Sequence, residues 1–441
     1  MPIDLVRDRH TNHLLKLDPG RFDCHTAVLA QSGAGKSFLV GRLIEELALK
    51  SKARVVILDP NSDFVRLGEP EPAVWGDPNL IPWFFPRETQ TRFETVWSQV
   101  DIRVLSNRNL PNARPLRINW GGLTDAERTS IMNIDPRDRP DIYWCLVLTA
   151  DIARERWDDS EEADYDFEHF REVADEICSF LITGEGPEDI KENPLALSLR
   201  SLGIGLPLHF KALNYQLGEY QIWRSTGETN EDVSDVLTAK SRRPFVTVLD
   251  LLSLETESER IALTTRAVTS LWTAAKQAYG DALRDIDQPD TRNPIFLVID
   301  EAHNIAPCSR TSPGSERLAG EIIRIAAEGR KFGLHLIIVT QRPRKVDANI
   351  LSECDNLIIM RVTNAADTAF CQQLFGFVSA GVSRTANELS VGDLFLQGRV
   401  NGGDTIWHAA PRRTREGGRS LSKKHWTGPY RFNSTRGARK P

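Results

Sequence analysis

Hydrophobic residues near the N-terminus form a repeating pattern of strands and a helix. An apolar run at 25–30 is followed by apolar residues three or four positions apart between 38 and 47, and a β-branched run occupies 54–59. A continuous apolar run favours a strand and a period of 3.6 favours a helix, so this pattern predicts strand, loop, helix and strand. That order is typical of a parallel sheet in an α/β protein.

The strand pattern stops after residue 66 and returns near residue 245. Residues 67–239 are rich in Trp, Pro and acidic residues, and they are predicted to form a large, mainly helical insertion. Helices are predicted in this range at 124–133, 141–157, 165–182 and 190–201. Further strands are predicted at 245–250, 294–300, 334–340 and 356–363, which gives a central parallel sheet of about six strands.

The C-terminal part is predicted to add a hairpin and a tail. Apolar residues at 394–397 and 405–407 flank Asn401-Gly402, a pair typical of β-hairpin turns. The predicted units are an N-terminal arm (1–21), an α/β core (22–66 and 240–378), the mainly helical insertion (67–239), the hairpin segment (379–411) and a basic tail (412–441).

The composition is that of a folded protein without membrane segments. Of the 441 residues, 40% are hydrophobic and 26% are charged, which argues against a disordered or fibrous chain. No apolar run approaches the roughly 18 residues that cross a membrane, and the N-terminus lacks the apolar core of a signal peptide. The six cysteines are scattered, without a C-x-x-C pair. We therefore expect a cytoplasmic protein.

Charge is distributed unevenly along the chain. Residues 412–441 hold ten Lys or Arg and one acid, a net charge of +9, so the first 411 residues carry −15 of the total of −6. Such a tail is expected either to bind DNA phosphates without reading sequence or to brace an acidic neighbouring subunit. Residues 158–192 hold fourteen acids and two basic residues, and this range is not expected to contact nucleic acid.

A loop after the first strand has the composition of a phosphate-binding loop. Residues 30–37 differ from the pattern G-x-x-x-x-G-K-[ST] only at Ala30, where the first Gly is expected. In such loops backbone N–H groups face the phosphates, the Lys reaches the β- and γ-phosphates, and the hydroxyl binds Mg²⁺. The strand before and the helix after this loop disfavour a chance Gly-rich turn. ATP and Mg²⁺ are therefore the expected ligands of Gln31, Ser32, Gly33, Ala34, Gly35, Lys36 and Ser37.

Two acids follow the apolar strand at 294–300. We expect Asp300 to hold the Mg²⁺ and Glu301 to orient and activate the attacking water, although solvated carboxylates that cap a strand would look the same in isolation. With Ala302 and His303 they form Asp-Glu-Ala-His, a motif of two-lobed helicases. Only 138 residues follow His303, too few for a second ATPase lobe. An arginine that stabilises the transferring phosphoryl group must then come from the same lobe or from a neighbouring subunit, which implies a ring.

Two further residues are candidates for the reaction. Arg330 ends a helix just before a strand and is the candidate arginine finger, or else a cation favourably placed at a helix C-terminus. Gln341 follows the next strand, where the sheet is expected to face the γ-phosphate, and is a candidate sensor or else a turn residue ahead of Pro343.

Weaker patterns leave two interpretations open. The segment 59–63, at the end of the second strand, suits either of two interpretations. One is a turn in which Asp or Asn side chains accept hydrogen bonds from the backbone, and the other is a contact with water or metal; the turn is favoured. The ten tryptophans, several of them in the insertion, suit core or subunit packing better than base stacking.

Together these motifs resemble the HerA branch of the HerA/FtsK superfamily of RecA-like ATPases. The resemblance implies a RecA-like P-loop ATPase core and hydrolysis of ATP in a homo-hexameric ring. It also implies that the reaction depends on the phosphate-loop Lys and Ser, the acid pair, the Gln after the strand and an Arg that acts across the subunit boundary. The segments that carry the resemblance are 30–37, 297–304, 327–333, 339–343 and 360–364. The residues that match the roles are Lys36, Ser37, Asp300, Glu301, Gln341 and Arg330.

Two features of the family have no counterpart in the sequence. HerA proteins carry an N-terminal β-barrel on which partners such as a nuclease dock, whereas about 24 residues precede the first strand here, so the helical insertion is expected to take over docking. Secretion-coupling members of the superfamily begin with membrane segments, which this sequence lacks.

The resemblance leaves two functions to compare. In the first, the ring threads DNA through a positively charged channel and moves it by sequential ATP hydrolysis, with a nuclease or other effector as partner. In the second, the ring is a nucleotide-controlled assembly platform for an effector enzyme in a phage-defence complex, with little motor activity of its own. A motor that moves protein substrates is disfavoured by the lack of membrane segments.

Overall fold

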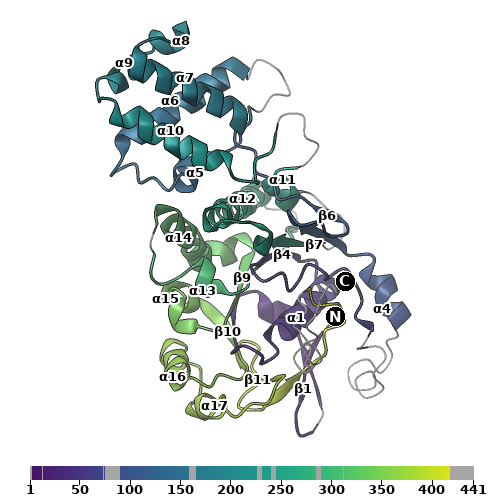
Figure 1. Ribbon diagram of the computed structural model, residues 1–441. Helices are drawn as coiled ribbons and strands as arrows, with labels where there is room; N and C mark the ends of the chain where they lie inside the picture. The colour runs from purple at the N-terminus through teal and green to yellow at the C-terminus, as the bar shows by residue number, and fades with distance from the viewer. Residues whose placement is uncertain are drawn as a thin grey trace, which may run out of the picture.

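The computed structural model describes residues 2–11, 13–72, 74, 90–157, 165–225, 231–239, 245–284, 290–310 and 312–417. Within these residues a twelve-stranded sheet has the order β2-β1-β12-β11-β10-β3-β9-β8-β4-β7-β5-β6. Several of its strands, among them β1, β4, β7, β9 and β10, are labelled in Figure 1. The strands from β10 to β6 run parallel, and the four at the other end are antiparallel. The predicted α/β fold with a parallel central sheet is confirmed.

All six predicted strands lie in the parallel part of the sheet. They are nearly continuous apolar runs because helices cover both faces, which is how parallel strands usually read in a sequence. Their bounds are β3 (His25–Leu29), β4 (Arg54–Asp59), β7 (Phe245–Asp250), β8 (Ile295–Ile299), β9 (Leu334–Thr340) and β10 (Cys354–Ile359).

The parallel sheet also contains two strands from the range that was predicted to be a helical insertion. β5 (Asp101–Leu105) pairs with β7, and the short β6 (Ala113–Arg114) pairs with β5. The sequence of β5 alternates charged and apolar residues, and Asp101 and Arg103 form an ion pair of 2.7 Å. Because this strand lies near the edge of the sheet and is only partly buried, it lacks the apolar run by which the other strands were predicted.

The antiparallel end of the sheet joins both ends of the described chain. β11 (Asp393–Gly398) and β12 (Trp407–Ala409) pair with Leu394 opposite Trp407, which confirms the predicted hairpin. The residues predicted to form an N-terminal arm hold β1 (Ile3–Asp8) and β2 (Leu14–Leu17), and β1 pairs with β12. These residues therefore extend the sheet.

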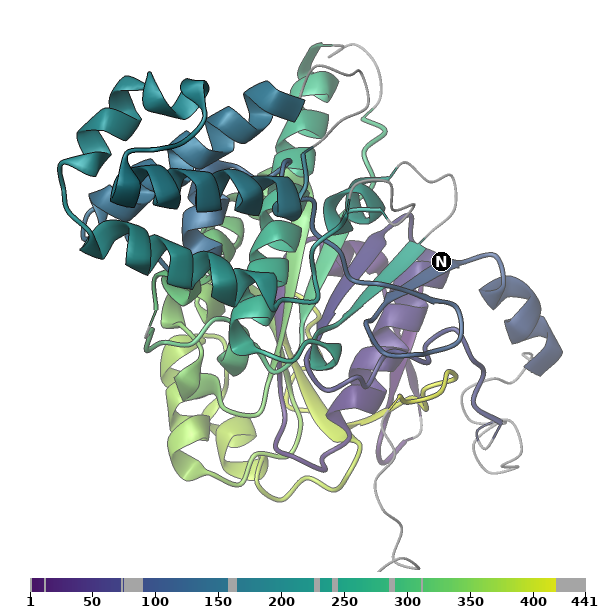
Figure 2. The same ribbon diagram turned by 45° about the horizontal axis from the view of Figure 1, so that its top comes forward.

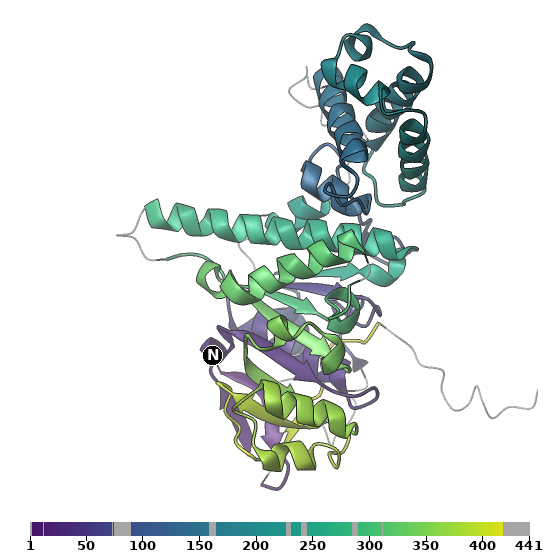
Figure 3. The same cartoon turned by 90° about the vertical axis from the view of Figure 1, so that its left-hand side faces the viewer.

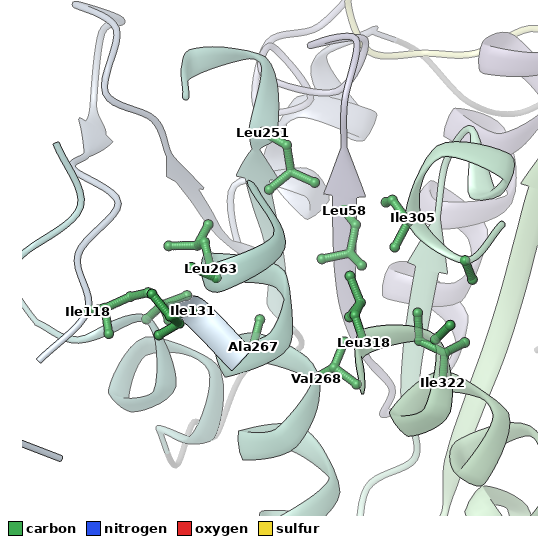
Figure 4. Packing of buried hydrophobic residues seen from close by; sticks show 14 of the residues in the cluster. Leu58, Ile118, Ile131, Leu251, Leu263, Ala267, Val268, Ile305, Leu318 and Ile322 are labelled. Carbon is green, nitrogen blue, oxygen red and sulfur yellow. The ribbon is translucent and has the colours of Figure 1, made fainter. Parts of the chain in front are cut away.

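Helices cover the two faces of the sheet and bury two separate sets of side chains. Successive residues of β3 alternate between the sets, with Ala27 and Leu29 in one and Val28 in the other. Helix α1 lies on one side and α12 and α14 on the other (Figure 2), and Figure 4 shows Val268 and Leu318 of the second side near Leu58 of β4. The helices around the core are α1 (Lys36–Lys50), α4 (Gln90–Trp97), α12 (Glu257–Arg284), α13 (Ala302–Ile305), α14 (Pro313–Glu328), α15 (Ala348–Leu351), α16 (Ala365–Leu374) and α17 (Ala380–Thr385).

The remaining helices form a lobe that projects beyond α12, away from the sheet (Figure 3). The four predicted helices of the insertion are present, and α10 was missed because its sequence contains Pro207 and begins and ends with Gly. The lobe is built from α5 (Asp125–Ile131), α6 (Pro140–Trp157), α7 (Phe167–Thr183), α8 (Glu188–Lys191), α9 (Pro194–Arg200) and α10 (Gly205–Gly218), and α11 (Val233–Thr238) leads back to the sheet.

Tryptophans of the insertion pack into cores. Trp120 is fully buried and makes an edge contact with Trp223 at 5.0 Å between ring centroids, and Trp97 is stacked with Phe93. Trp144 is half exposed, and Trp75 and Trp83 lie outside the described residues.

Among the helices that the structure describes, none is both long and apolar enough to cross a membrane.

The first residues of the predicted basic tail belong to the folded core. We call residues 411–417 the C-terminal strap. Arg413 is 2% exposed and its guanidinium pairs with Glu45 (3.0 Å) and Glu46 (2.5 Å) of α1. Arg412 is fully buried against Gly41, where a Cβ atom would lie 2.5 Å from its side chain. The basic tail is therefore not a free arm from its first residue. Residues 418–441 lie outside the described residues.

Candidate nucleotide site

The loop between β3 and α1 has the conformation of a phosphate-binding loop. Gly33 and Gly35 have φ values of 75° and 98°, in the left-handed region that other residues rarely adopt. Gly35 directly precedes α1, a helix of 15 residues, so the free N–H groups at its start point out of the loop. The amides and the helix dipole together favour a bound anion at this point.

This loop forms one wall of a pocket of about 500 Å³. The pocket lies at the carboxyl edge of the parallel sheet, where open α/β sheets bind their ligands. Its lining includes two residues that reach it from the ends of other strands, Glu301 after β8 and Gln341 after β9. The full lining is Gln31, Ser32, Gly33, Gly35, Lys36, Ser37, Phe38, Asn61, Asp63, Glu301, Gln341, Val391 and Glu416. Ala34 is buried behind the loop.

Lys36 joins the phosphate loop to the acid pair. Its Nζ atom lies 2.8 Å from Oδ1 of Asp300 and 2.6 Å from Oε1 of Glu301. Burial lowers the pKa of Lys36, but the two carboxylates outweigh burial and raise it, so the amine is a cation. Burial raises the pKa of Asp300, and Glu301 and Asp63 add to this effect while Lys36 opposes it. The predicted meeting of these three residues is therefore found.

Glu301 adopts an unusual backbone conformation. Its φ and ψ angles of 45° and 48° lie in the left-handed region, which costs a residue with a Cβ atom roughly 1–2 kcal/mol. This turn directs the carboxylate back to Lys36 before α13 begins. Strained residues of this kind persist where the surrounding structure fixes them, and they cluster at functional sites.

Oxygen atoms suited to Mg²⁺ lie next to the loop. The Ser37 hydroxyl lies 2.5 Å from Oδ2 of Asp63, and the buried Oδ2 atom of Asp300 has no hydrogen-bond partner. Among the described residues no group of three His, Cys, Asp or Glu lies close enough together to hold a metal ion. Mg²⁺ prefers oxygen ligands and usually combines one or two carboxylates with water and substrate phosphates. The residues present therefore fit Mg²⁺.

The segment after β4 forms the predicted turn and also reaches the site. Oδ1 of Asp59 accepts a hydrogen bond from Asp63 N (3.0 Å), and Oδ2 accepts one from Phe64 N (2.8 Å). Burial raises the pKa of Asp59 to about 7. The turn brings Asp63 against Ser37, a contact that the sequence did not predict.

Gln341 and Gln31 are held by the strands beside them. Gln341 lines the pocket directly after β9, as predicted for a sensor. The side chain of Gln31 instead accepts hydrogen bonds from the backbone N–H (3.1 Å) and the hydroxyl (2.7 Å) of Thr363. The backbone N–H of Gln31 donates a hydrogen bond to the backbone oxygen of Arg361 (2.9 Å). Gln31 therefore ties the phosphate loop to the segment that follows β10.

Arg330 does not reach this pocket. It lies in the 3-10 turn Gly329–Phe332, which precedes β9, whereas Gln341 follows the same strand. At about 3.3 Å per residue the two lie roughly 20 Å apart, at opposite edges of the sheet. Arg330 is half exposed and pairs with Asp355 at 2.8 Å. Any role in catalysis must therefore be exerted on another subunit.

The sequence did not reveal that the C-terminal strap lines the pocket. Glu416 is part of the pocket wall, and burial together with the nearby Asp63 raises its pKa. Arg412 donates a hydrogen bond to the backbone oxygen of Asp63 (3.2 Å), and the N–H of Gly417 donates to the same atom (3.0 Å). Only the buried Glu45-Glu46 pair of α1 hints at this contact in the sequence, because two adjacent acids on one helix need cations when they are buried.

Comparisons with known proteins place the chain in a family. The model described as the helicase HerA, central domain, matches residues 10–268, more than half of the chain. A probable helicase of Methanocaldococcus jannaschii is 38% identical over 109 residues, which are 25% of this chain and 20% of that protein. The DNA double-strand break repair helicase HerA of Pyrococcus furiosus is 24% identical over 393 residues, which cover 81% of this chain and 60% of that protein. The chain thus covers less than two thirds of these relatives.

Solved structures with the same fold agree with this assignment. VirB4 of Thermoanaerobacter pseudethanolicus superposes with a TM-score of 0.54 at 13% identity and covers 97% of this chain and 98% of that one. The bacterial conjugative coupling protein TrwB gives a TM-score of 0.51 at 12% identity, with 91% and 88% covered. At this identity the likeness concerns the fold alone, a RecA-like P-loop ATPase fold. The phosphate loop, the acid pair and the match to the family model lead to one conclusion, that this chain belongs to the HerA helicase family.

Proposed function

We propose that this protein hydrolyses ATP with Mg²⁺ and uses the energy to move or remodel DNA as part of a homo-hexameric ring. The observation that carries the proposal is the meeting of Lys36 with Asp300 and Glu301 in one pocket that is also lined by the phosphate loop and Gln341. These groups come from three neighbouring strand ends, which a merely structural role would not require.

Each residue has a chemical task in this proposal. The backbone amides of Ser32, Gly33 and Gly35 and the Lys36 ammonium bind the phosphates. Ser37 and Asp300 would hold Mg²⁺, which would neutralise charge on the phosphates. Glu301 orients the attacking water and takes its proton, since its carboxylate borders the pocket beside the phosphate loop. Gln341 contacts the terminal phosphate as the sensor.

The position of Arg330 supports the proposed ring. Because this residue lies at the opposite edge of the sheet from its own pocket, it can stabilise the transition state only in a neighbouring copy. A ring in which the amino edge of one subunit faces the carboxyl edge of the next would bring the two together. The relatives from M. jannaschii and P. furiosus are named as helicases, which supports DNA as the substrate of the ring.

The test is steady-state ATPase activity with and without double-stranded DNA, with Glu301→Gln as the blank and the particle mass measured in the same buffer. A ring-sized particle whose turnover rises with DNA is the expected result. A particle that hydrolyses ATP at the same rate with and without DNA contradicts the DNA motor and leaves the ATPase. A protein without turnover contradicts both.

A second candidate function is a nucleotide-controlled assembly platform for an effector such as a nuclease in a phage-defence complex. One observation favours it: the helical lobe exposes large apolar side chains around α9 and α10, a composition typical of protein interfaces. They are Leu197, Leu202, Ile204, Leu208 and Tyr215, each between 51% and 66% exposed. A platform predicts a stoichiometric partner in co-purification from the native operon, whose activity changes with Lys36→Ala. No partner together with DNA-stimulated turnover would rule it out.

A further inference from the structure

A histidine joins the ends of two strands that serve the pocket. His303 lies in α13, directly after the acid pair of β8, and its side chain is 7% exposed. Its Nδ1 atom lies 3.1 Å from the hydroxyl oxygen of Thr340, the last residue of β9. The same atom lies 3.3 Å from Oε2 of Glu301. One ring nitrogen thus faces both the acid that we propose as general base and the strand that carries Gln341.

Thr340 passes this contact to the turn around Gln341. Its hydroxyl accepts a hydrogen bond from the backbone N–H of Arg342 (3.0 Å), which closes the turn with Gln341 at its middle. Its backbone oxygen accepts a hydrogen bond from the N–H of Ala30 (3.3 Å), at the start of the phosphate loop. A hydroxyl has one donor and two acceptor sites, so it can bond Arg342 and the imidazole together.

Glu301 needs a partner at the oxygen that faces this histidine. Its Oε1 atom binds Lys36, whereas the buried Oε2 atom has no aligned hydrogen bond, although the imidazole is close. A triphosphate competes with Glu301 for the Lys36 ammonium, because that group is the cation of the phosphate loop. A carboxylate that shares its cation in a buried site depends on the remaining N–H donors for its orientation.

We propose that His303 is a positioning residue, which holds Glu301 through Nδ1 and couples its orientation to the turn that presents Gln341. The proposal rests on the proposed ATPase function. The ring is suited to this task in its neutral form, which has a single N–H to share between Thr340 and Glu301. Burial lowers the pKa of His303, and Arg342, Lys36 and Lys345 lower it further while Glu301 raises it.

His303 also borders a second cavity. His303 and Asn304 line this cavity of about 540 Å³, and Asn61 lines both it and the nucleotide pocket. When pH falls, a neutral ring that carries its proton on Nδ1 binds the second proton at Nε2. The imidazolium then pairs with Glu301 as a cation and lowers the basicity of the carboxylate. Turnover is expected to fall at acid pH for this reason.

Three variants separate positioning by Nδ1 from simple packing. In Asn the amide nitrogen lies two bonds from Cβ, as Nδ1 does in His. In Gln it lies three bonds from Cβ, as Nε2 does in His. The side chain of Leu has no N–H group. We expect His303→Leu and His303→Gln to lower kcat by roughly 10²-fold, the usual cost of a misplaced catalytic group. His303→Asn should restore kcat, and its pH profile should lack the acid loss due to His303. The affinity for ADP with Mg²⁺ should remain that of the wild type in all three.

The outcomes distinguish this inference from the function on which it rests. Wild-type kcat in His303→Leu, or equal losses in the Asn and Gln variants with unchanged thermal unfolding, overturns the positioning role and leaves the ATPase standing. A wild-type protein that does not hydrolyse ATP overturns the proposed function and the role of His303 with it. If His303→Leu does not fold, the difference between the Asn and Gln variants decides.

Discussion

At the carboxyl edge of the parallel sheet buried acids meet a lysine, whereas at the amino edge two buried histidines meet each other. Asp59 and Asp300 end β4 and β8. His25 begins β3, and His335 lies at the start of β9 with its ring centroid 6.4 Å away. Burial holds the pKa of both histidines at about 4, so they are neutral, and it raises the pKa of both acids. Burial therefore disfavours charge at both edges.

The two edges differ in what compensates for burial. At the carboxyl edge the Lys36 ammonium pairs with Asp300 and Glu301, and the residues Ser62 and Glu301 have positive φ angles of 62° and 45°. At the amino edge Arg330 is paired with a partly exposed acid, Asp355. Ionised side chains that are held in a buried and strained setting are typical of a functional site, whereas buried side chains that become neutral are typical of a packed core. This contrast favours the carboxyl edge as the place of the reaction and the amino edge as the surface that contacts a neighbouring subunit.

The largest effect is expected from Glu301→Gln at the carboxyl edge. The amide keeps the size of the side chain but cannot take a proton, so kcat should fall by about 10⁴-fold, at the upper end of what a general base contributes. Binding of ATP should persist because Lys36 and the phosphate loop remain. The measurement is single-turnover hydrolysis beside equilibrium binding. Glu321→Gln, on the outer helix α14, is the control and should match the wild type. Retained turnover in Glu301→Gln would remove the general base from this residue.

The next effect tests whether the amino edge acts on another subunit. Arg330→Ala should lower kcat by about 10³-fold, as expected for a lost arginine finger, without weakening ATP binding. Arg399→Ala is the matched control, because Arg399 pairs with Asp23 at 2.5 Å and is 42% exposed, much like Arg330. Mixing Arg330→Ala with Lys36→Ala subunits should restore part of the activity, since some interfaces then combine an intact pocket with an intact arginine. Mixtures as inactive as their components would contradict the assignment.

The sequence predicts the local motifs of the site better than the contacts between different strands. The phosphate loop, the acid pair and Gln341 are local signals, since each motif follows an apolar run that itself predicts a strand. The contact of Thr340 with His303 and the contact of Asp63 with Ser37 depend on which strands become neighbours in the sheet. No single segment of the sequence determines this strand order. Strand β5 was missed because its charged residues pair with each other at the sheet edge.

The strap shows the limit of reading charge from sequence. Arg413 looks like part of a solvated basic tail, but the two acids with which it pairs lie more than 360 positions away in the sequence. The side chains of Glu45 and Glu46 are fully buried, so a cation beside them is a structural requirement, and Arg413 pairs with both.

Two truncations that differ by six residues separate the strap from the tail. Cutting after Pro411 removes Arg413 from Glu45 and Glu46 and should lower the free energy of unfolding by about 3–5 kcal/mol, the usual cost of breaking a buried ion pair. Cutting after Gly417 leaves these contacts and should leave that free energy unchanged. Denaturant unfolding measures both. Salt dependence of DNA binding then tests the tail alone: a shallower slope after the cut at 417 supports phosphate contacts, and an unchanged slope supports bracing of a neighbour. Equal stability of the two truncated forms would contradict the structural role of the strap.

The smallest effect concerns the histidines of the amino edge. Each has a folded pKa of about 4, below its usual value of 6.5, so the unfolded chain binds protons first as pH falls below 6.5. The free energy of unfolding should therefore decrease by about 1.4 kcal/mol per pH unit for each histidine, until both states are protonated below about pH 4. His335→Phe should remove one such contribution, because Nδ1 of His335 is buried without a hydrogen-bond partner and the ring already packs against Phe296. His25→Phe is the contrasting variant, since it also loses the hydrogen bond from the N–H of Leu336 (2.8 Å) and should be less stable at every pH. Denaturant unfolding at pH 7.5 and 5 distinguishes them, and a His335→Phe profile parallel to that of the wild type would show that this edge does not hold its histidines neutral.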